Sequence, residues 1–189
     1  MKKRDLGSKL ALYPNPLLLV GTYDDSGKPN VMTVGWGGIC NSRPPCVAIS
    51  VRKETNTYQG LINRKAFTIN IPDEKFINET SYFGIASGHN VNKFEETGLT
   101  PIKSDFIDAP YIEEIPLNIE CEVIQTIEIG SHTQFIGLIK NVKIDSSFDE
   151  EKPIIEQLNP IIYGVGDNHQ YYTINKKLKK PNIKGRKLK

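Results

Sequence analysis

The chain has 189 residues, of which 38% are hydrophobic and 24% charged, a composition typical of one globular domain with a core of its own. Its formal net charge of +2 conceals an acidic body: residues 1–175 carry 16 basic and 22 acidic residues, while residues 176–189 carry eight Lys or Arg and no acid. The acidic body argues against nucleic acid as a partner, and no apolar run approaches the roughly 18 residues of a membrane-spanning helix.

The first elements form a predicted hairpin. Residues 16–23, PLLLVGTY, are a continuous apolar run typical of a buried strand, and residues 24–27, DDSG, predict a turn. Residues 28–38, KPNVMTVGWGG, predict the second strand of the hairpin. Three glycines interrupt that strand around Trp36, the only tryptophan of the chain, although glycine weakens strand pairing.

A third strand and a helix follow a Pro-Pro pair. Residues 46–52, CVAISVR, alternate as a strand does. Residues 53–64, KETNTYQGLINR, have helix character, and either Thr55 or Asn56 can act as the N-cap. This order places the start of a helix directly after a strand end.

Another strand and another short helix come next. Residues 66–71, AFTINI, predict a strand that ends at Pro72. Asp73 is a suitable N-cap for a short helix over residues 72–86.

The clearest strand pattern lies in residues 117–129, LNIECEVIQTIEI, which alternate with period two. A tight turn at Gly130-Ser131 then predicts a hairpin with residues 132–145. The apolar side chains expected to share one face of the first strand are Leu117, Ile119, Cys121, Val123, Ile127 and Ile129.

Six or more strands, two or three short helices and hairpin links predict a mainly β fold, an antiparallel barrel or sandwich. A doubly wound nucleotide-binding fold is disfavoured. GWGG does not fit G-x-G-x-x-G, because Cys40 stands three positions after Gly37, and no helix follows it.

The basic tail, residues 176–189, is expected to lie outside the domain formed by residues 1–175. Such a segment is typical of a solvated tail, although it can also bind nucleic acid or an acidic partner protein.

The three cysteines, Cys40, Cys46 and Cys121, are odd in number and lack C-x-x-C spacing. Together with only three histidines, this favours reduced, buried thiols over a disulfide or a metal site. No apolar segment of a signal peptide follows the basic start of the chain, so we expect a cytoplasmic protein.

No side-chain catalytic set is legible, since the chain lacks a G-x-S-x-G motif and its histidines are far apart. The segment RKETNTY is more informative. Arg52 and Lys53 close a strand, and Thr55 and Thr57 stand at a helix start, where unpaired N–H groups favour a phosphate. The alternative is a surface strand end with a threonine cap.

Two further segments can contribute to a ligand site. In IASGHNVNKF, Ser87 and Gly88 offer a hydroxyl and an accessible backbone, and Lys93 adds charge, although the glycine can simply end a helix. The glycines beside Trp36 would let a flat ligand approach the backbone, and the indole offers a planar surface. Trp36 can equally be a core residue.

Taken together, these segments resemble the flavin reductase-like, FMN-binding split-barrel family over nearly the whole chain before the tail. No single segment is decisive, but six occur in the family's order. They are YPNPLLLVGTYDDSGKPNVMTVGWGG, PPCVAISVRKETNTY, FTINIP, YFGIASGHNVNKFEETGLTP, DAPYIEEIPLNIECEV and GSHTQFIGLI.

The resemblance implies an antiparallel Greek-key split β-barrel that forms a homodimer with one FMN per subunit. It implies a role for His132 near the reactive face of the flavin. The implied FMN-binding residues are Thr33, Val34, Gly35 and Trp36 beside the ring, Asn41 and Ser42 towards the ribityl chain, and Ser50, Arg52, Thr55, Thr57, Ser87 and Gly88 at the phosphate.

Three functions remain open at this point. The chain can be a flavin reductase that takes hydride from NAD(P)H, which needs no side-chain acid/base set because FMN carries the chemistry. It can be an electron carrier of the flavoredoxin kind that exchanges electrons with a redox partner protein. It can also be a binding module that uses its basic tail.

Overall fold

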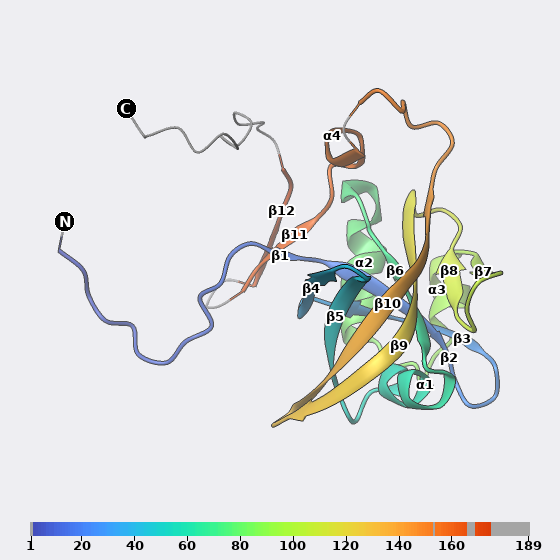
Figure 1. The fold of residues 1–189 in the computed structure, drawn as a ribbon, viewed down its shortest axis with the longest axis horizontal. Coiled ribbons are helices and arrows are strands. Elements are labelled where there is room, and N and C mark those ends of the chain that lie inside the picture. Colours follow the sequence, from blue (N-terminus) through green and yellow to red (C-terminus); the bar gives the residue numbers. More distant parts are fainter. Residues whose placement is uncertain (1, 153, 166–168, 175–189) are drawn as a thin grey trace.

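A curved, seven-stranded antiparallel sheet forms the body of the protein (Figure 1). The computed structural model describes residues 2–152, 154–165 and 169–174, so the basic tail lies outside the described residues. In spatial order the strands are β3 (Pro29–Val34), β2 (Leu18–Tyr23), β6 (Ala66–Asn70), β9 (Leu117–Ile129), β10 (His132–Ile144), β5 (Pro45–Arg52) and β4 (Gly37–Ser42).

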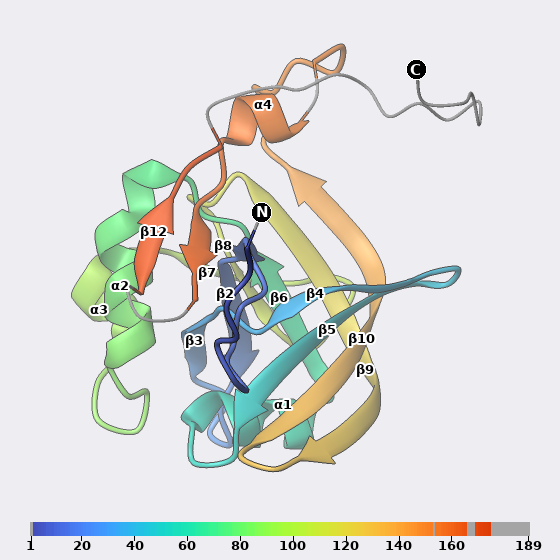
Figure 2. The same ribbon diagram turned by 90° about the vertical axis from the view of Figure 1, so that its left-hand side faces the viewer.

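All neighbouring strands of this sheet pair antiparallel, which confirms the predicted mainly β fold. The two edge strands, β3 and β4, are consecutive in the chain and are separated only by Gly35 and Trp36. The sheet therefore curls round so that its edges approach each other, as Figure 2 shows. The N–H of Ser50 on β5 donates to the carbonyl oxygen of Trp36 at 2.8 Å and holds the connection.

The prediction of one strand over residues 28–38 is wrong. β3 ends at Val34, and Gly37 already begins β4, which pairs with β5 on the other side of the barrel. A period-two pattern cannot show this change, because two strands joined by a very short connection look like one interrupted strand.

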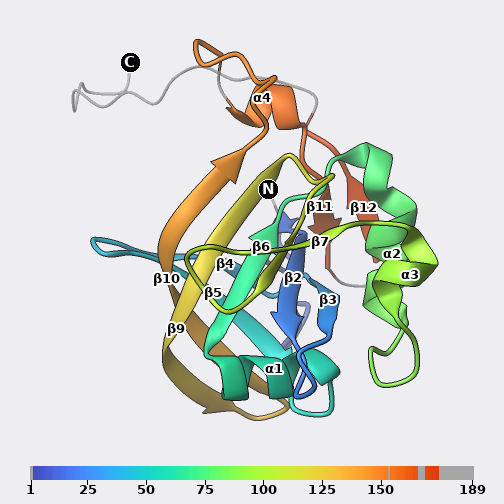
Figure 3. The ribbon, with the colours of Figure 1, turned by 90° about the vertical axis from the view of Figure 1, so that its right-hand side faces the viewer.

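Short elements surround the barrel. Helices α2 (Ile77–Ile85) and α3 (Lys93–Thr97) pack against β3, and α1 (Asn56–Arg64) packs on β2 at one end, as Figure 3 shows. The helical elements are α1 (Asn56–Arg64), η1 (Glu74–Phe76), α2 (Ile77–Ile85), α3 (Lys93–Thr97) and α4 (Ile154–Leu158). The small sheets are β1 (Asn15–Pro16) with β11 (Ile162–Gly164) and β12 (Gln170–Tyr172), and β7 (Pro101–Lys103) with β8 (Pro110–Ile112).

Both predicted helix caps are present. Thr55 is the N-cap of α1, and its hydroxyl accepts from the N–H of Tyr58 at 3.2 Å. Asp73 accepts from the N–H of Lys75 at 3.0 Å, but the segment after it is divided into the 3-10 turn η1 and helix α2. The N-cap at Thr55 matters for the site, because it orients the first turn of α1 towards β3.

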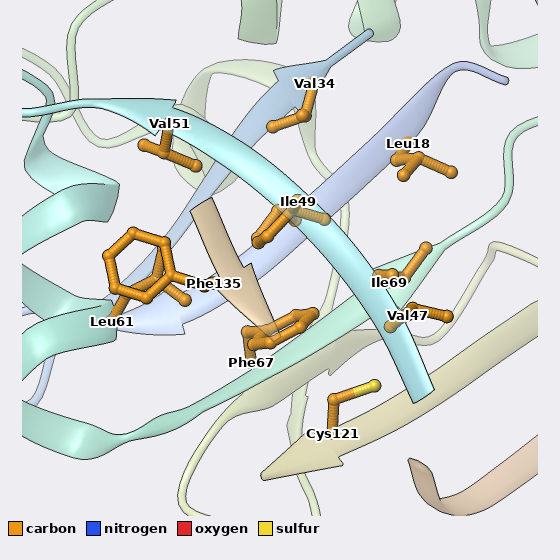
Figure 4. Packing of buried hydrophobic residues seen from close by; sticks show 11 residues of the cluster. Leu18, Val34, Val47, Ile49, Val51, Leu61, Phe67, Ile69, Cys121 and Phe135 are labelled. Atoms are coloured by element: carbon orange, nitrogen blue, oxygen red, sulfur yellow. The ribbon is translucent and has the colours of Figure 1, made fainter. Parts of the chain in front are cut away.

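The core lies between β2, β5, β6, β9, β10 and α1, and Figure 4 shows its side chains from close by. Phe67 on β6 and Phe135 on β10 are fully buried within it. Their neighbours are the aliphatic side chains that the alternating patterns place on the inner face of each strand. The core therefore fixes the strands that carry the candidate site.

The expected single apolar face of β9 holds only as far as Val123. Val123 pairs with Gly137 and Gln125 pairs with Ile136, so Ile124 forms a bulge and the faces exchange beyond it. Ile129, which was expected on the face of Val123, therefore lies on the other face and is 57% exposed.

All three cysteines are free thiols. Cys46 and Cys121 are buried, and burial raises the pKa of the Cys121 thiol to about 12. The expectation that all three are buried is wrong for Cys40, which is exposed on the edge strand β4. An edge strand leaves one side without a neighbour, which local sequence does not reveal.

Candidate functional site

Two contiguous cavities open beside β3. The first, of about 220 Å³, lies between β3, β5 and the start of β10. The second, of about 180 Å³, lies between the start of α1, the end of α2 and the loop that follows it. Met32, Thr55 and Gly84 line both, so the two cavities adjoin each other.

The cavities bring together most of the residues that the sequence singles out. The first is lined by Thr33, Val34, Gly35, Trp36, Ser50, Arg52, Thr55 and His132. The second is lined by Thr55, Thr57, Ser87 and Gly88.

The first cavity has a planar and backbone-rich wall. Trp36 is half-buried against the core and its ring lies 6.4 Å from that of Tyr163, so it is both a packing residue and a wall of the cavity. His132 stands opposite Arg52 in the pairing of β10 with β5, and its Nδ1 lies 2.9 Å from the hydroxyl of Ser131. These groups provide polar contacts around a flat surface.

Close packing within the protein accounts for glycine at two of the three positions beside Trp36. A Cβ on Gly37 would lie 2.6 Å from Leu18 Cδ1, and one on Gly35 would lie 3.0 Å from the ring of Tyr163. A Cβ on Gly38 would meet nothing within 4 Å. Packing between strands therefore accounts for Gly37 without a ligand, while Gly35 also lines the first cavity.

The second cavity ends at the N-terminus of α1. The first N–H groups of a helix have no partner within the helix, and they point out of its start. Asn56 lies there with a buried side-chain oxygen that has no partner. The buried Thr57 hydroxyl accepts from Asn30 Nδ2 at 2.9 Å. This end can donate several hydrogen bonds to an anion.

The loop after α2 closes the same end. A Cβ on Gly88 would lie 2.2 Å from Asn30 Oδ1, so only glycine allows the loop to approach β3 this closely. The N–H of His89 donates to the Ser87 hydroxyl at 3.3 Å. The ring nitrogen Nδ1 of His89 lies 3.5 Å from Asn56 Nδ2. Sequence reasoning missed Asn30 and Asn56, since nothing local shows that a strand residue and a helix start share a cavity.

Lys93 forms part of the wall of the second cavity and was noted in the sequence only as a charge. It is 4% exposed, and its Nζ donates to the carbonyl oxygens of Val31 at 2.8 Å and Phe83 at 3.1 Å. Burial lowers the pKa of this ammonium group to about 8.

Asn41 and Ser42 line neither of the two cavities. Both are exposed near the tip of the β4–β5 hairpin, where Asn41 Nδ2 donates to the carbonyl oxygen of Pro44 at 2.8 Å. Ser42 stands five residues beyond Gly37, roughly 16 Å further along the strand.

Comparison with known proteins decides the family. Residues 10–171 match the family model described as the flavin reductase like domain. The chain belongs to this family. Its fold is accordingly the mainly β, antiparallel Greek-key split barrel that the sequence predicts.

Solved structures of the flavin reductase-like family superimpose closely. Flavoredoxin of Desulfovibrio vulgaris (Miyazaki F) is 43% identical with a TM-score of 0.90, and 98% of this chain and 100% of that chain are covered. Flavoredoxin from Methanosarcina acetivorans is 27% identical with a TM-score of 0.89 and covers 98% of both chains. An uncharacterised protein from Archaeoglobus fulgidus is 30% identical over 76% of this chain and 80% of its own length.

The lining of the two cavities fits a flavin. The space has a flat wall at one end and a polar pocket with helix N–H groups and a buried ammonium at the other. In that pocket the buried Asn56 side-chain oxygen is a hydrogen-bond acceptor without a partner in the protein.

In residues 2–152, 154–165 and 169–174, no group of three or more His, Cys, Asp or Glu side chains could hold a metal ion. None of the helices in the described part of the chain is long and apolar enough to span a membrane.

Proposed function

We propose that the protein binds FMN in the paired cavities and passes electrons or hydride through it. The observation that carries this proposal is that the two cavities are contiguous, with a flat wall at one end and an anion pocket at the other. Bound FMN supplies the redox chemistry, accepting hydride or electrons and releasing them one or two at a time. The protein contributes binding, orientation and exclusion of water.

The proposed contacts follow from the lining of each cavity. The proposed ring contacts are Thr33, Val34, Gly35 and Trp36 in the first cavity. Ser50 and Arg52, which the resemblance assigns to the phosphate, line this first cavity and not the second. At the phosphate stand Thr55, Thr57, Ser87 and Gly88.

His132 is the proposed residue beside the reacting atoms. It lines the first cavity at the start of β10, so its ring can donate a hydrogen bond to the flavin or orient a nicotinamide. Its other role is structural, because the contact with Ser131 lies within the hairpin turn. His132→Gln distinguishes the two: if reduction of the flavin keeps its rate while FMN affinity is unchanged, only the structural role remains.

We expect the purified protein to be yellow, with an absorbance spectrum that corresponds to about one FMN per chain. Measuring released flavin against protein concentration checks this. A colourless protein that takes up no FMN on reconstitution would remove the proposed function.

Two kinds of electron donor, a reduced nicotinamide and a reduced protein, could serve the same site. Rapid bleaching of the flavin in anaerobic stopped-flow mixing with NADH or NADPH would identify a reductase. Flavin that stays oxidised with NADH and NADPH, but accepts electrons from a reduced partner protein, would identify an electron carrier. The 43% identity to a flavoredoxin supports the second donor.

We further propose a homodimer in which the β4–β5 hairpin of each subunit reaches the flavin of the other. Asn41 and Ser42 lie too far along the hairpin for their own cavities. Ile39 on the same strand is 85% exposed in the single chain, and burial of this apolar side chain in a dimer interface would explain its exposure.

The three free thiols support a reducing, cytoplasmic location.

Light scattering tests the dimer, with an expected mass of twice the 21.2 kDa of the chain. Ile39→Glu is expected to yield monomers, because a buried charge at the interface lacks a partner. Asn41→Ala with Ser42→Ala is expected to leave the dimer intact and weaken FMN binding. A monomeric wild-type protein with full FMN occupancy would contradict the proposal.

A further inference from the structure

A third cavity, of about 430 Å³, lies between the N-terminal arm, residues 2–14, and the connection from β3 to β4. The arm forms neither helix nor strand, and Figure 1 shows it in dark blue, running from β1 away from the barrel. Residues 9–12 of the arm and residues 35–37 of the connection line the cavity, together with Asn15 and Val165. Its volume is that of a site for a small molecule.

The third cavity adjoins the first but is a separate space. Gly35 and Trp36 line both, so ligands in the two cavities would share Trp36 as a wall. Among the described lining residues, His132 and Arg52 belong to the first cavity and not to the third, and the second and third cavities have no residue in common. The third cavity can therefore hold a ligand other than the flavin and its electron donor at His132.

The lining of the third cavity is mainly apolar. Leu10, Leu12 and Val165 contribute aliphatic side chains, and Leu12 is 80% exposed. Covering an exposed apolar side chain with an apolar ligand is favourable, because it removes that surface from water. The indole of Trp36 adds a flat aromatic surface, against which another ring packs well. These walls favour a flat, ring-shaped ligand.

Positive charge accompanies this apolar lining. Lys9 is the only charged residue among the described residues that line the third cavity, and Asn15 adds a side-chain amide. The surrounding arm is also basic, since residues 2–9 carry four Lys or Arg and one acid. A ligand with a negative charge complements this end of the chain, although the body of the protein is acidic.

We propose that the third cavity binds a second small molecule, an aromatic carboxylate of one or two rings. Its rings lie against Trp36 and the arm leucines, and its carboxylate lies near Lys9 and Asn15. The inference goes beyond the proposed function and does not require it, because the residues proposed to bind the phosphate take no part in this site. Where FMN fills the first cavity, the carboxylate and the flavin are neighbours on either side of a shared wall.

The test follows the indole N–H signal of Trp36 in two-dimensional ¹⁵N NMR spectra, which is unambiguous because the chain has one tryptophan. FMN-loaded protein is titrated with 2-naphthoate and with its neutral counterpart 2-naphthamide. We expect both probes to shift the signal in a saturable way, 2-naphthoate with a Kd of about 1 mM or lower, as is usual for ligands of this size. We expect 2-naphthamide to bind roughly two- to fivefold more weakly, since it lacks the charge.

Variants of the arm have matched controls on the same arm. Lys9→Met should weaken 2-naphthoate by roughly two- to fivefold and leave 2-naphthamide unchanged, whereas Lys3→Met should behave as wild type. Leu10→Ser with Leu12→Ser should weaken both probes by roughly tenfold or more, and Leu6→Ser, which lies outside the cavity, should weaken neither. All five side chains are exposed, so the variants should fold.

Several results would overturn the inference: a Trp36 signal that neither probe shifts, equal affinity for the two probes, or unchanged binding in the double leucine variant. Probe binding that FMN abolishes would assign the third cavity to the flavin. A Trp36 signal that shifts with protein concentration and not with the probes would assign the cavity to a second copy of the chain. Either result also overturns the inference. If the protein takes up no FMN, the proposed function fails, and titration of the flavin-free protein still tests the carboxylate site.

Discussion

Replacing Thr55 and Thr57 together with alanine is expected to weaken FMN binding more than any other change at the cavities. A hydrogen bond to a charged phosphate contributes roughly 1.5–3 kcal/mol, or about 10- to 150-fold in Kd for each hydroxyl. Thr57 should carry the larger share. Its hydroxyl accepts from Asn30 and keeps its hydrogen, whereas that of Thr55 donates to the carbonyl oxygen of Arg52.

The loss of a helix cap must be separated from the loss of a ligand contact. Thr55→Ala removes the N-cap of α1, which costs about 1 kcal/mol of stability. Thr55→Ser with Thr57→Ser keeps both hydroxyls and is the matched control. Isothermal titration with FMN, together with urea unfolding of the flavin-free variants, separates the two effects. Undiminished FMN affinity in a folded double alanine variant would refute the phosphate assignment.

Phe67→Ala is expected to cost about 3–5 kcal/mol of the free energy of unfolding, the largest stability effect that we predict for one side chain. The ring is fully buried in the core between β6, β9 and β10. Its close fit is visible at Gly137, where a Cβ would lie 2.4 Å from the ring atom Cζ. Alanine would leave a cavity that neighbouring strands can close only in part.

Urea unfolding of flavin-free protein measures this cost, because bound ligand would add its own stabilisation. Phe106→Ala is the control, since Phe106 is 56% exposed and contacts Lys143 through a cation–π interaction worth about 0.5–1 kcal/mol. Gly137→Ala should destabilise the wild type by overpacking and cost less in the Phe67→Ala background. A loss below about 1 kcal/mol for Phe67→Ala would contradict the close packing of this ring in the core.

Much of the local structure follows from short-range patterns. The Thr55 cap, the long hairpin of β9 and β10 and the apolar strand β2 depend on residues at most a few positions apart. Caps, turns and alternation act at this range, so sequence is sufficient for them. These patterns do not reveal a change of geometry over one or two residues, as at the Ile124 bulge and at the Gly35-Trp36 connection between β3 and β4.

The order of its segments was enough to indicate the family and the mainly β barrel of this protein, because each segment carries its own pattern. Only the tertiary structure decided which of the selected residues share a space. It joins the two cavities through Met32 and Gly84, leaves Asn41 outside them, and buries Lys93. The Lys93 contacts reach carbonyl groups 62 and 10 residues away in the chain. Burial arises from such distant contacts, and no local pattern of residues determines them.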